Sequence, residues 1–252
     1  MSAEKTLALV LRVVEFSESS LIVTLFTRDF GKVHGLAKGG RRPKGPFESA
    51  LDLLSLCRIV FLRKSSEALD LLTEAKLERR FRLATRDLSC LYAGYYVAEL
   101  LNELTDDSDP QPDLFDAANE TLARLMTPGV RVGAVVLRFE LTALRAVGHQ
   151  PALNACAECG KPIAETGRVP FGVLAGGVLC AACRPGKKQV VSISRPAIDA
   201  LKTFADPSNE AWQTFGLDRA VAGELRGLMN RYLWSLLGHK PRLHDYLGTA
   251  SE

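Results

Sequence analysis

The sequence of 252 residues contains no stretch of about 18 or more consecutive apolar residues, the length that a membrane-spanning helix requires. Its first residues also lack the order of a secretory signal peptide, in which charged, then apolar, then small residues follow one another. We therefore expect a cytoplasmic protein whose cysteines stay reduced, rather than a membrane protein or a disulfide-bonded secreted one.

The chain also has no large excess of one charge. Its 32 lysines and arginines stand against 29 aspartates and glutamates, a formal net charge of +3. This balance excludes the uniformly basic surface that is typical of many nucleic-acid-binding proteins. The average hides local differences, because residues 1–81 hold 14 basic and 10 acidic side chains whereas residues 82–135 hold 4 and 9. A local basic site in the first 81 residues remains compatible with the composition.

Signatures of the common enzyme classes are missing. The sequence has neither the G-x-S-x-G nor the H-E-x-x-H pattern, and Gly39-Gly40 fits no phosphate-binding glycine motif. The acidic stretch from Asp106 to Asp116 lacks the spacing of a calcium-binding EF-hand loop. The histidines are scattered, at His34, His149, His239 and His244. We therefore expect a protein that is not an enzyme.

Residues 1–80 show the pattern of a small β-barrel. Runs of β-branched and aromatic residues separated by turn residues predict about five strands. Their expected ranges are Thr6–Phe16, Ser20–Thr27, Lys32–Ala37, Ala50–Leu62 and Ala68–Leu77. Five short strands in a segment of this length favour an OB-fold or an SH3-like barrel.

From about residue 82 the apolar spacing becomes helical. We expect one helix through Leu88 and Leu101, a second N-capped by Asp113, and a third that opens at Pro128 and ends at Gly148. After a cysteine-rich insert, Ser194 is predicted to N-cap a further helix, and a last helix spans about residues 218–237. The predicted organisation is α+β and multidomain: a barrel at 1–80, a helical bundle in two parts at 81–153 and 189–252, and an insert at 154–188.

Four of the six cysteines form two C-x-x-C pairs, Cys156/Cys159 and Cys180/Cys183. Two such tight turns bring four thiolates into the tetrahedron that Zn²⁺ takes in closed structural sites. An iron–sulfur cluster and a redox-active C-x-x-C are alternatives with weaker support, because the first suits paired turns less well and the second is normally single. We expect one structural zinc ion. Cys57 and Cys90 stand alone in apolar surroundings and are expected in the core.

A basic segment follows the third predicted strand. Lys38, Arg41, Arg42 and Lys44 lie within nine residues that contain no acidic residue, and Lys32, Arg63 and Lys64 extend this predicted patch. Exposed cations on a loop can follow a phosphate backbone without reading sequence, although a solvated loop is an equally simple interpretation. The nearby aromatic residues Phe26, Phe30 and Phe47 are expected in the core rather than as platforms for bases.

Three stretches of the sequence resemble the RecO family of bacterial recombination mediators. The first is Thr24–Thr27 followed by Gly31 and by Ala37–Arg42. The second runs from Arg138 to Gly148 and continues through Pro151 and Leu153 into the first cysteine pair. The third is Gly176-Gly177 before the second pair. The resemblance covers nearly the whole chain in order.

The resemblance implies an N-terminal OB-fold, a helical bundle and a zinc insert. It also implies a protein that binds single- and double-stranded DNA, anneals complementary strands, and with RecR helps RecA to displace single-strand binding protein. The acidic C-terminal tail of that binding protein is expected to engage the helical domain beside basic residues. The candidates, which could equally be a solvated helix face, are Arg219, Arg226, Arg231, Lys240 and Arg242.

Two alternatives stay open. A zinc-ribbon adaptor that contacts only proteins would leave the basic loop merely solvated. A zinc hydrolase or deaminase would need an open coordination position and a general base beside it, and the sequence suggests neither.

Overall fold

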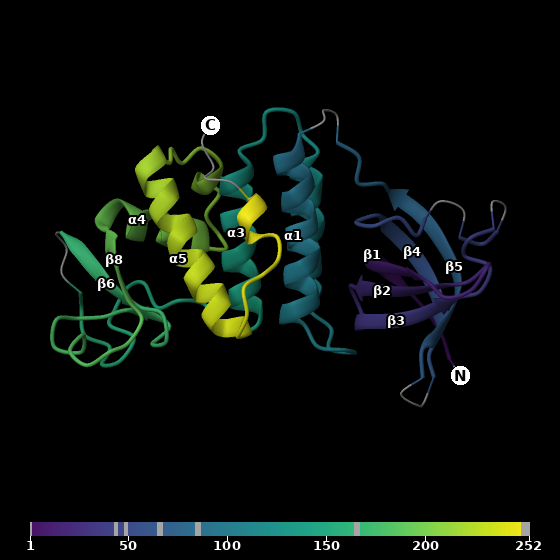
Figure 1. Cartoon of the computed structure of the whole chain (residues 1–252), viewed down its shortest axis with the longest axis horizontal. Coiled ribbons are helices and arrows are strands. Elements are labelled where there is room, and N and C mark those ends of the chain that lie inside the picture. The colour runs from purple at the N-terminus through teal and green to yellow at the C-terminus, as the bar shows by residue number, and fades with distance from the viewer. Residues whose placement is uncertain are drawn as a thin grey trace. The chain divides into compact units, whose positions relative to one another are not determined.

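The computed structural model describes residues 2–42, 45–47, 50–64, 68–83, 87–163 and 167–247 (Figure 1). The chain divides into two compact units, Met1–Val130 and Arg131–Glu252. Both the barrel and the first two helices belong to the N-terminal unit, and the cysteine-rich insert belongs to the C-terminal unit. The boundary falls inside the segment 81–153, which the sequence analysis treated as one helical part.

The N-terminal unit is built on five strands that close into a barrel in the order β1-β2-β3-β5-β4. Neighbouring strands are antiparallel except β3 and β5, which pair in parallel through Gly35–Ala37 and Asp70–Leu72. Five strands agree with the sequence prediction. Their bounds are β1 Ala3–Glu15, β2 Leu21–Thr27, β3 Gly31–Ala37, β4 Leu56–Leu62 and β5 Asp70–Arg79.

The largest difference from the predicted strands is the start of the fourth, whereas the first begins three residues earlier than predicted. β4 begins at Leu56 and not at Ala50, because the chain turns sharply before it. Leu54 adopts a positive φ of 63° and donates its backbone N–H to the carbonyl of Val10. A branched residue in this left-handed region cannot continue a strand.

Alternating burial along the strands fills the barrel. In β3 every second residue is buried, which is the period that a strand with one inward face requires. Phe61 and Phe47 are buried inside the barrel, whereas Phe26 is fully buried on the outer side of β2, with its ring centroid 6.1 Å from that of Phe115. Phe30 packs edge-on against Phe61, with ring centroids 5.5 Å apart. The expectation that Phe26, Phe30 and Phe47 belong to the core is confirmed.

Two helices pack on the barrel within the N-terminal unit, α1 Leu88–Leu104 and α2 Pro112–Leu125. Gly31 lies so close to the backbone of Asp109 that no larger residue would fit there. Arg28 donates two hydrogen bonds of 2.9 Å to the carboxylate of Asp116 on α2. The residue that precedes α2 is Gln111 and not Asp113, because Pro112 occupies the first helical position, where its missing N–H costs nothing.

The C-terminal unit begins with α3, Val132–Ala146. This helix starts four residues later than predicted, because Gly129 takes a positive φ of 74° and directs the chain through a turn after Pro128. Arg131 then donates a hydrogen bond of 2.6 Å to the carbonyl of Phe215. The predicted end is confirmed, since Gly148 has a φ of 77° and directly follows the C-cap residue Val147.

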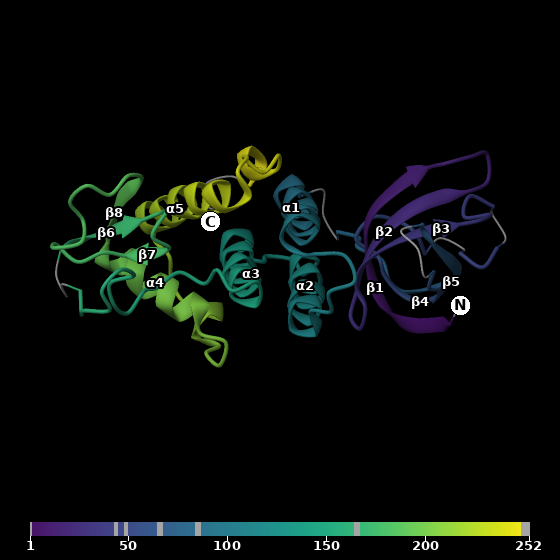
Figure 2. The ribbon, with the colours of Figure 1, turned by 90° about the horizontal axis from the view of Figure 1, so that it is seen from below.

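A small sheet and two further helices complete this unit. The strands β6 Arg168–Gly172, β7 Gly177–Val178 and β8 Val190–Ser194 lie in the order β7-β6-β8. The helices α4 (Arg195–Ala205) and α5 (Arg219–Leu237) contact each other, and both contact β8 (Figure 2). Short 3-10 helices follow α4 and α5, η1 Ala211–Gln213 and η2 His244–Tyr246. Ser194 caps α4 as predicted, by accepting the N–H of Ala197.

Among the described residues, no helix combines the length and the apolar composition needed to cross a membrane.

Candidate metal centre and nucleic-acid interface

The two C-x-x-C turns come together in the C-terminal unit. The sulfurs of Cys156, Cys159, Cys180 and Cys183 all lie within 4.8 Å of one another, and those of Cys159 and Cys180 are 3.8 Å apart. The spacing that the sequence showed therefore produces a four-sulfur cluster in space.

Backbone N–H groups point at these sulfurs. Hydrogen bonds from the N–H groups of Cys180, Cys159 and Glu158 lower the pKa of Cys156 to about 6, and the N–H of Cys183 lowers the pKa of Cys180. The pKa of Cys183 is raised to about 12, because its thiol lies against the other three sulfurs and keeps a proton among them. A cation at the centre would replace that proton, because a metal binds thiolates and releases their protons.

The geometry fits a single tetrahedral metal ion. Zinc–sulfur bonds of about 2.3 Å place the sulfurs of a tetrahedron about 3.8 Å apart, the separation found between Cys159 and Cys180. A cluster of two or four irons shares the four cysteines among several metal atoms, which spreads the sulfurs farther apart. Four thiolates also fill the coordination sphere, so the site suits structural zinc rather than a catalytic ion.

The cysteine turns are built into the rest of the unit. Ala157 beside Cys156 donates its N–H to the carbonyl of Val178 on the second hairpin, at 2.8 Å. Gly177 is pressed against the backbone of Ala152, where a side chain would collide, and Gly176 supplies a positive φ of 72°. The pair Gly176-Gly177 thus turns the hairpin and also permits a close backbone contact.

The two remaining cysteines lie in the core of the N-terminal unit, as expected. Burial is the main reason that the pKa of Cys57 rises to about 12 and the pKa of Cys90 to about 11. Both therefore stay protonated at neutral pH, which favours packing over reactivity.

The basic loop follows β3 at one end of the barrel. Lys38, Arg41 and Arg42 are all exposed. The loop is folded rather than free, because the N–H of Arg41 donates to the carbonyl of Ser19 at 3.1 Å and the N–H of Arg42 to that of Gly39 at 3.0 Å. Arg41 also forms an ion pair of 3.0 Å with Glu15. Lys44 lies outside the described residues.

The other predicted members of the patch lie elsewhere. Lys32 is on the second residue of β3, and its ammonium donates to the carbonyls of Asn102 and Thr105 at the C-terminal end of α1. Its side chain is only 12% exposed, so it contributes to the attachment of the helix and not to an open surface. Arg63 follows β4, and its guanidinium lies 6.0 Å from the ring centre of Phe30. Phe30 itself lies in the turn between β2 and β3.

Lys64 is exposed next to Arg63, and its backbone N–H donates to Asp70 at 2.8 Å. The structure therefore brings Lys38, Arg41 and Arg42 together at the end of β3, while Lys32 and Arg63 lie toward its beginning. His34, another scattered titratable residue, contacts Thr24 and Asp107 from the middle of the same strand, each at 3.2 Å.

Sequence reasoning missed Phe16. This side chain is 62% exposed at the end of β1, close to the basic loop, whereas the aromatic residues singled out from the sequence are in the core. The available signal was its position: the alternating strand pattern stops at Phe16, and the polar run Ser17-Glu18-Ser19-Ser20 follows.

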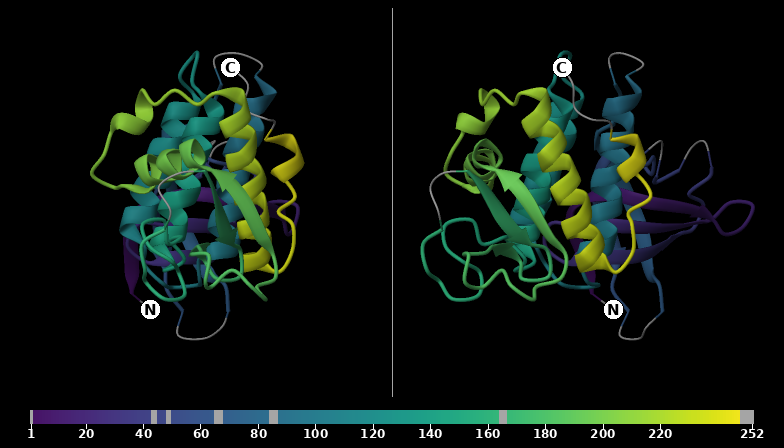
Figure 3. Two further views of the ribbon diagram at one scale, coloured as in Figure 1. Left: turned by 90° about the vertical axis from the view of Figure 1, so that its left-hand side faces the viewer. Right: turned by 60° about the vertical axis from the view of Figure 1, so that its left-hand side comes forward.

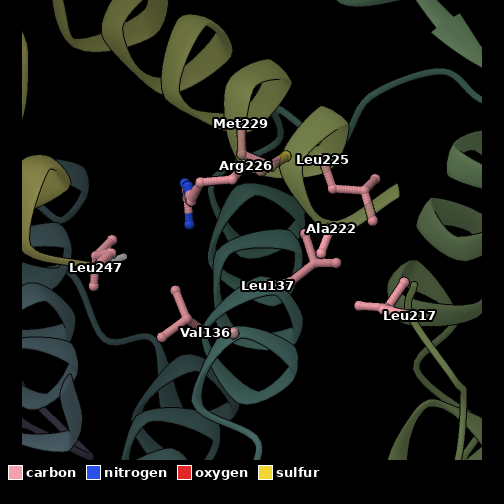
Figure 4. Close-up of a pocket in the computed structure, with 9 residues that line it drawn as sticks. Val136, Leu137, Leu217, Ala222, Leu225, Arg226, Met229 and Leu247 are labelled. Atoms are coloured by element: carbon pink, nitrogen blue, oxygen red, sulfur yellow. The ribbon is translucent and has the colours of Figure 1, made fainter. Parts of the chain in front are cut away.

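The predicted basic residues of the last helix have different surroundings. Figure 4 shows Arg226 beside a hollow between α3 and α5. The hollow is lined mainly by apolar side chains, including Val136, Leu137, Ala222, Leu225 and Met229. Arg226 is held there by Glu140 at 2.6 Å and by Asn230 at 2.7 Å. Arg219, Arg231 and Arg242 are exposed, and Lys240 pairs with Asp245.

Comparisons of this chain with known proteins show which family it belongs to. A family described as "Recombination protein O N terminal" matches residues 1–81, and "Recombination protein O C terminal" matches residues 85–244. A DNA repair protein RecO from Rhodopirellula baltica is 43% identical to this chain, over 96% of this chain and 97% of that protein. Proteins of the same name from Anaeromyxobacter dehalogenans and Myxococcus xanthus are 34% and 31% identical. Those alignments cover 98% and 95% of this chain, and 96% and 95% of the two proteins. The chain therefore belongs to the RecO family of DNA repair proteins.

Proposed function

We propose that this protein is a DNA repair and recombination mediator that is not itself an enzyme. It binds single- and double-stranded DNA without reading sequence, anneals complementary strands, and with RecR helps to load RecA on DNA coated by single-strand binding protein. The family membership supports the repair role, and the order of strands supports the OB-fold architecture that holds single strands in other proteins.

The exposed basic loop is the observation that carries the DNA-binding part of this proposal. Lys38, Arg41 and Arg42 project from one short segment that backbone hydrogen bonds hold on the barrel. Cations fixed in this way can neutralise successive phosphates and release their counterions. Because none of these contacts depends on a base, affinity should be nearly independent of sequence.

Salt titration of DNA binding tests this part. Changing Lys38, Arg41, Arg42 and Lys44 together to Ala should lower the affinity for every DNA sequence and flatten the dependence of log K on log salt. Each lost phosphate contact should reduce that slope by about 0.7 for single strands. The matched control changes four exposed cations of the C-terminal unit, Lys161, Arg184, Lys187 and Lys188, to Ala. Unchanged affinity and slope in the loop variant would leave a zinc-ribbon adaptor without direct DNA binding as the better function.

Annealing follows from the same electrostatics. Two complementary strands repel each other through their phosphates, and a surface that neutralises part of both charges lowers that repulsion. The protein needs no chemical step for this effect. In the proposed mechanism, the zinc centre keeps the C-terminal unit folded and the barrel supplies the contact with DNA.

The hollow beside Arg226 is the proposed site for the tail of single-strand binding protein. An acidic tail that ends in an aromatic residue needs an apolar recess with a cation at its edge, and this hollow combines the two (Figure 4). Glu140 and Asn230 orient the guanidinium in advance, which reduces the entropy lost when a carboxylate binds.

Binding of a synthetic tail peptide tests that assignment. Ala222 lines the hollow, so Ala222→Phe fills it and should weaken peptide binding about tenfold or more. Ala220→Phe is the matched control, because Ala220 is exposed on the same helix and does not line the hollow. Equal peptide affinity for both variants and the unmodified protein would place the tail elsewhere.

A further inference from the structure

One large aromatic side chain of the barrel points away from its core. Phe16 is 62% exposed, whereas Phe26, Phe47 and Phe61 are at most 4% exposed. The backbone around Phe16 is ordered, because its N–H donates to the carbonyl of Ser20 at 3.0 Å and closes the turn between β1 and β2. The β1–β2 hairpin projects from the barrel in the right-hand view of Figure 3.

The basic loop is hydrogen-bonded to this same turn. Arg41 donates its backbone N–H to Ser19 in this turn, and its guanidinium lies 3.0 Å from Glu15, the residue before Phe16. The basic loop is therefore attached to the turn that carries Phe16, at the same end of the barrel. An exposed Phe alone needs no explanation, but an exposed Phe in a turn that is hydrogen-bonded to a basic loop offers both kinds of contact that single-strand binding uses.

We propose that Phe16 is a base-stacking residue for single-stranded DNA or RNA on this barrel. This inference rests on the proposed DNA binding by the basic loop and adds a second kind of contact to it. The loop residues hold phosphates, and the ring of Phe16 accepts the face of an unpaired base.

The side chains around Phe16 suit a nucleic-acid base better than an extended apolar protein segment. Val14 lies two residues before Phe16, on the same face of β1, and is 39% exposed. Its cross-strand partner Ile22 is partly buried, so the apolar surface around the ring is small. Arg12 is exposed on the same face of the strand. One flat ring with cations nearby suits a single planar base and its phosphate better than it suits an apolar protein segment.

Stacking also predicts a preference between nucleic acids. The faces of bases in a duplex are covered by their neighbours, so Phe16 can stack on a single strand without an unstacking cost but not on an intact duplex. Phosphate contacts of the loop are available in both. Phe16 should therefore contribute to the affinity for single strands and leave the affinity for duplex DNA unchanged.

Binding of a fluorescent oligothymidine and of a duplex to the full chain tests the proposal. Phe16→Ala should weaken single-strand binding about tenfold or more, within the range for one stacked base, with duplex binding and the salt slope unchanged. Phe16→Tyr should restore the affinity, since the ring is kept. Leu88→Ala is the matched control, because Leu88 is 59% exposed in the same unit, at the start of α1.

Photocrosslinking gives a second measurement that does not depend on affinity. An oligonucleotide that carries 5-iodouracil should crosslink to the tryptic peptide that spans residues 13–28, with the modified residue at Phe16. Crosslinks confined to other peptides, or an equal loss of single-strand and duplex affinity in Phe16→Ala, would overturn the stacking proposal. If the variant of the four loop residues binds DNA as the unmodified protein does, the proposed DNA binding by the loop fails, whatever Phe16 does.

Discussion

Arg226 on α5 forms a short ion pair with Glu140 on α3, with 2.6 Å between the guanidinium Nη2 and the carboxylate Oε1. The side chain of Glu140 is fully buried and that of Arg226 is 16% exposed. A buried carboxylate requires such a partner, because removing it from water costs several kcal/mol. This pair joins two helices on which the C-terminal unit depends, beside the hollow proposed for the peptide.

Breaking this pair should destabilise the C-terminal unit strongly. Arg226→Ala removes the cation and should cost about 3–5 kcal/mol of unfolding free energy. The double change Glu140→Leu with Arg226→Met should recover most of that loss, since two apolar residues need no partner. Both tryptophans, Trp212 and Trp234, lie in the C-terminal unit, so denaturation followed by tryptophan fluorescence reports on this unit. A double variant as unstable as Arg226→Ala would contradict the electrostatic explanation.

The C-terminal unit should lose stability in mild acid through His244. Burial, together with the positive charges of Arg226 and Lys240, lowers the pKa of His244 to about 4, while Asp245 acts in the opposite direction. The unfolded chain, with a His pKa near 6.5, binds the proton first as the pH falls. Folding is therefore weakened between pH 6.5 and 4, by at most about 1.4 kcal/mol per pH unit from this residue.

Urea denaturation at pH 7.5, 6 and 5 measures this effect. His244→Gln cannot bind the proton, so the loss of stability between pH 7.5 and 5 should be smaller in the variant than in the unmodified protein. Identical pH dependence in the two proteins would show that His244 is not the titrating group.

Metal removal should act first on the C-terminal unit. Metal analysis of the purified protein should find about one equivalent of zinc, released together with four reactive thiols. Cys156→Ser should destabilise the insert and, through the hydrogen bond from Tyr232 to the carbonyl of His149, the attachment of α5. The four cysteines lie outside the barrel. The affinity for DNA should therefore change little, while the free energy of unfolding of the C-terminal unit falls. Less than about half an equivalent of zinc would contradict the assignment.

Releasing Arg41 from its ion pair should strengthen DNA binding. Glu15→Gln removes the acceptor that now lies 3.0 Å from the guanidinium, so Arg41 becomes available to a phosphate. The expected gain is small, about two- to tenfold at low salt, because exposed ion pairs are weak. Glu18→Gln is the control for general charge, since Glu18 is exposed in the same turn. An equal effect of the two changes would mean that only the local charge matters, and not the pair.

The parts of the fold that could be predicted from the sequence depend on local patterns. The strand positions follow from alternation, and Ser194 and Gly148 mark helix ends by their own chemistry. The cysteine cluster is also local in origin, because each C-x-x-C turn presents two sulfurs by itself. Only the tertiary structure shows that the two turns lie next to each other, which a metal site with four cysteine ligands requires.

The parts that could not be predicted depend on contacts between distant segments. Lys32 has the sequence signature of a surface cation, yet it is used at the end of α1, about 70 residues away in the chain. Phe16 resembles the other phenylalanines in sequence, and only the closed barrel shows that it points outward. The boundary between the units after Val130 is hidden as well, because the helical pattern continues on both sides.

Annealing of complementary strands coated with single-strand binding protein tests the central claim most directly. The unmodified protein should accelerate annealing, and the variant with Lys38, Arg41, Arg42 and Lys44 changed to Ala should lose most of that acceleration. The control variant with Lys161, Arg184, Lys187 and Lys188 changed to Ala should keep it. Equal acceleration by the loop variant and the unmodified protein would contradict the claim that this loop on the barrel is the DNA-binding surface.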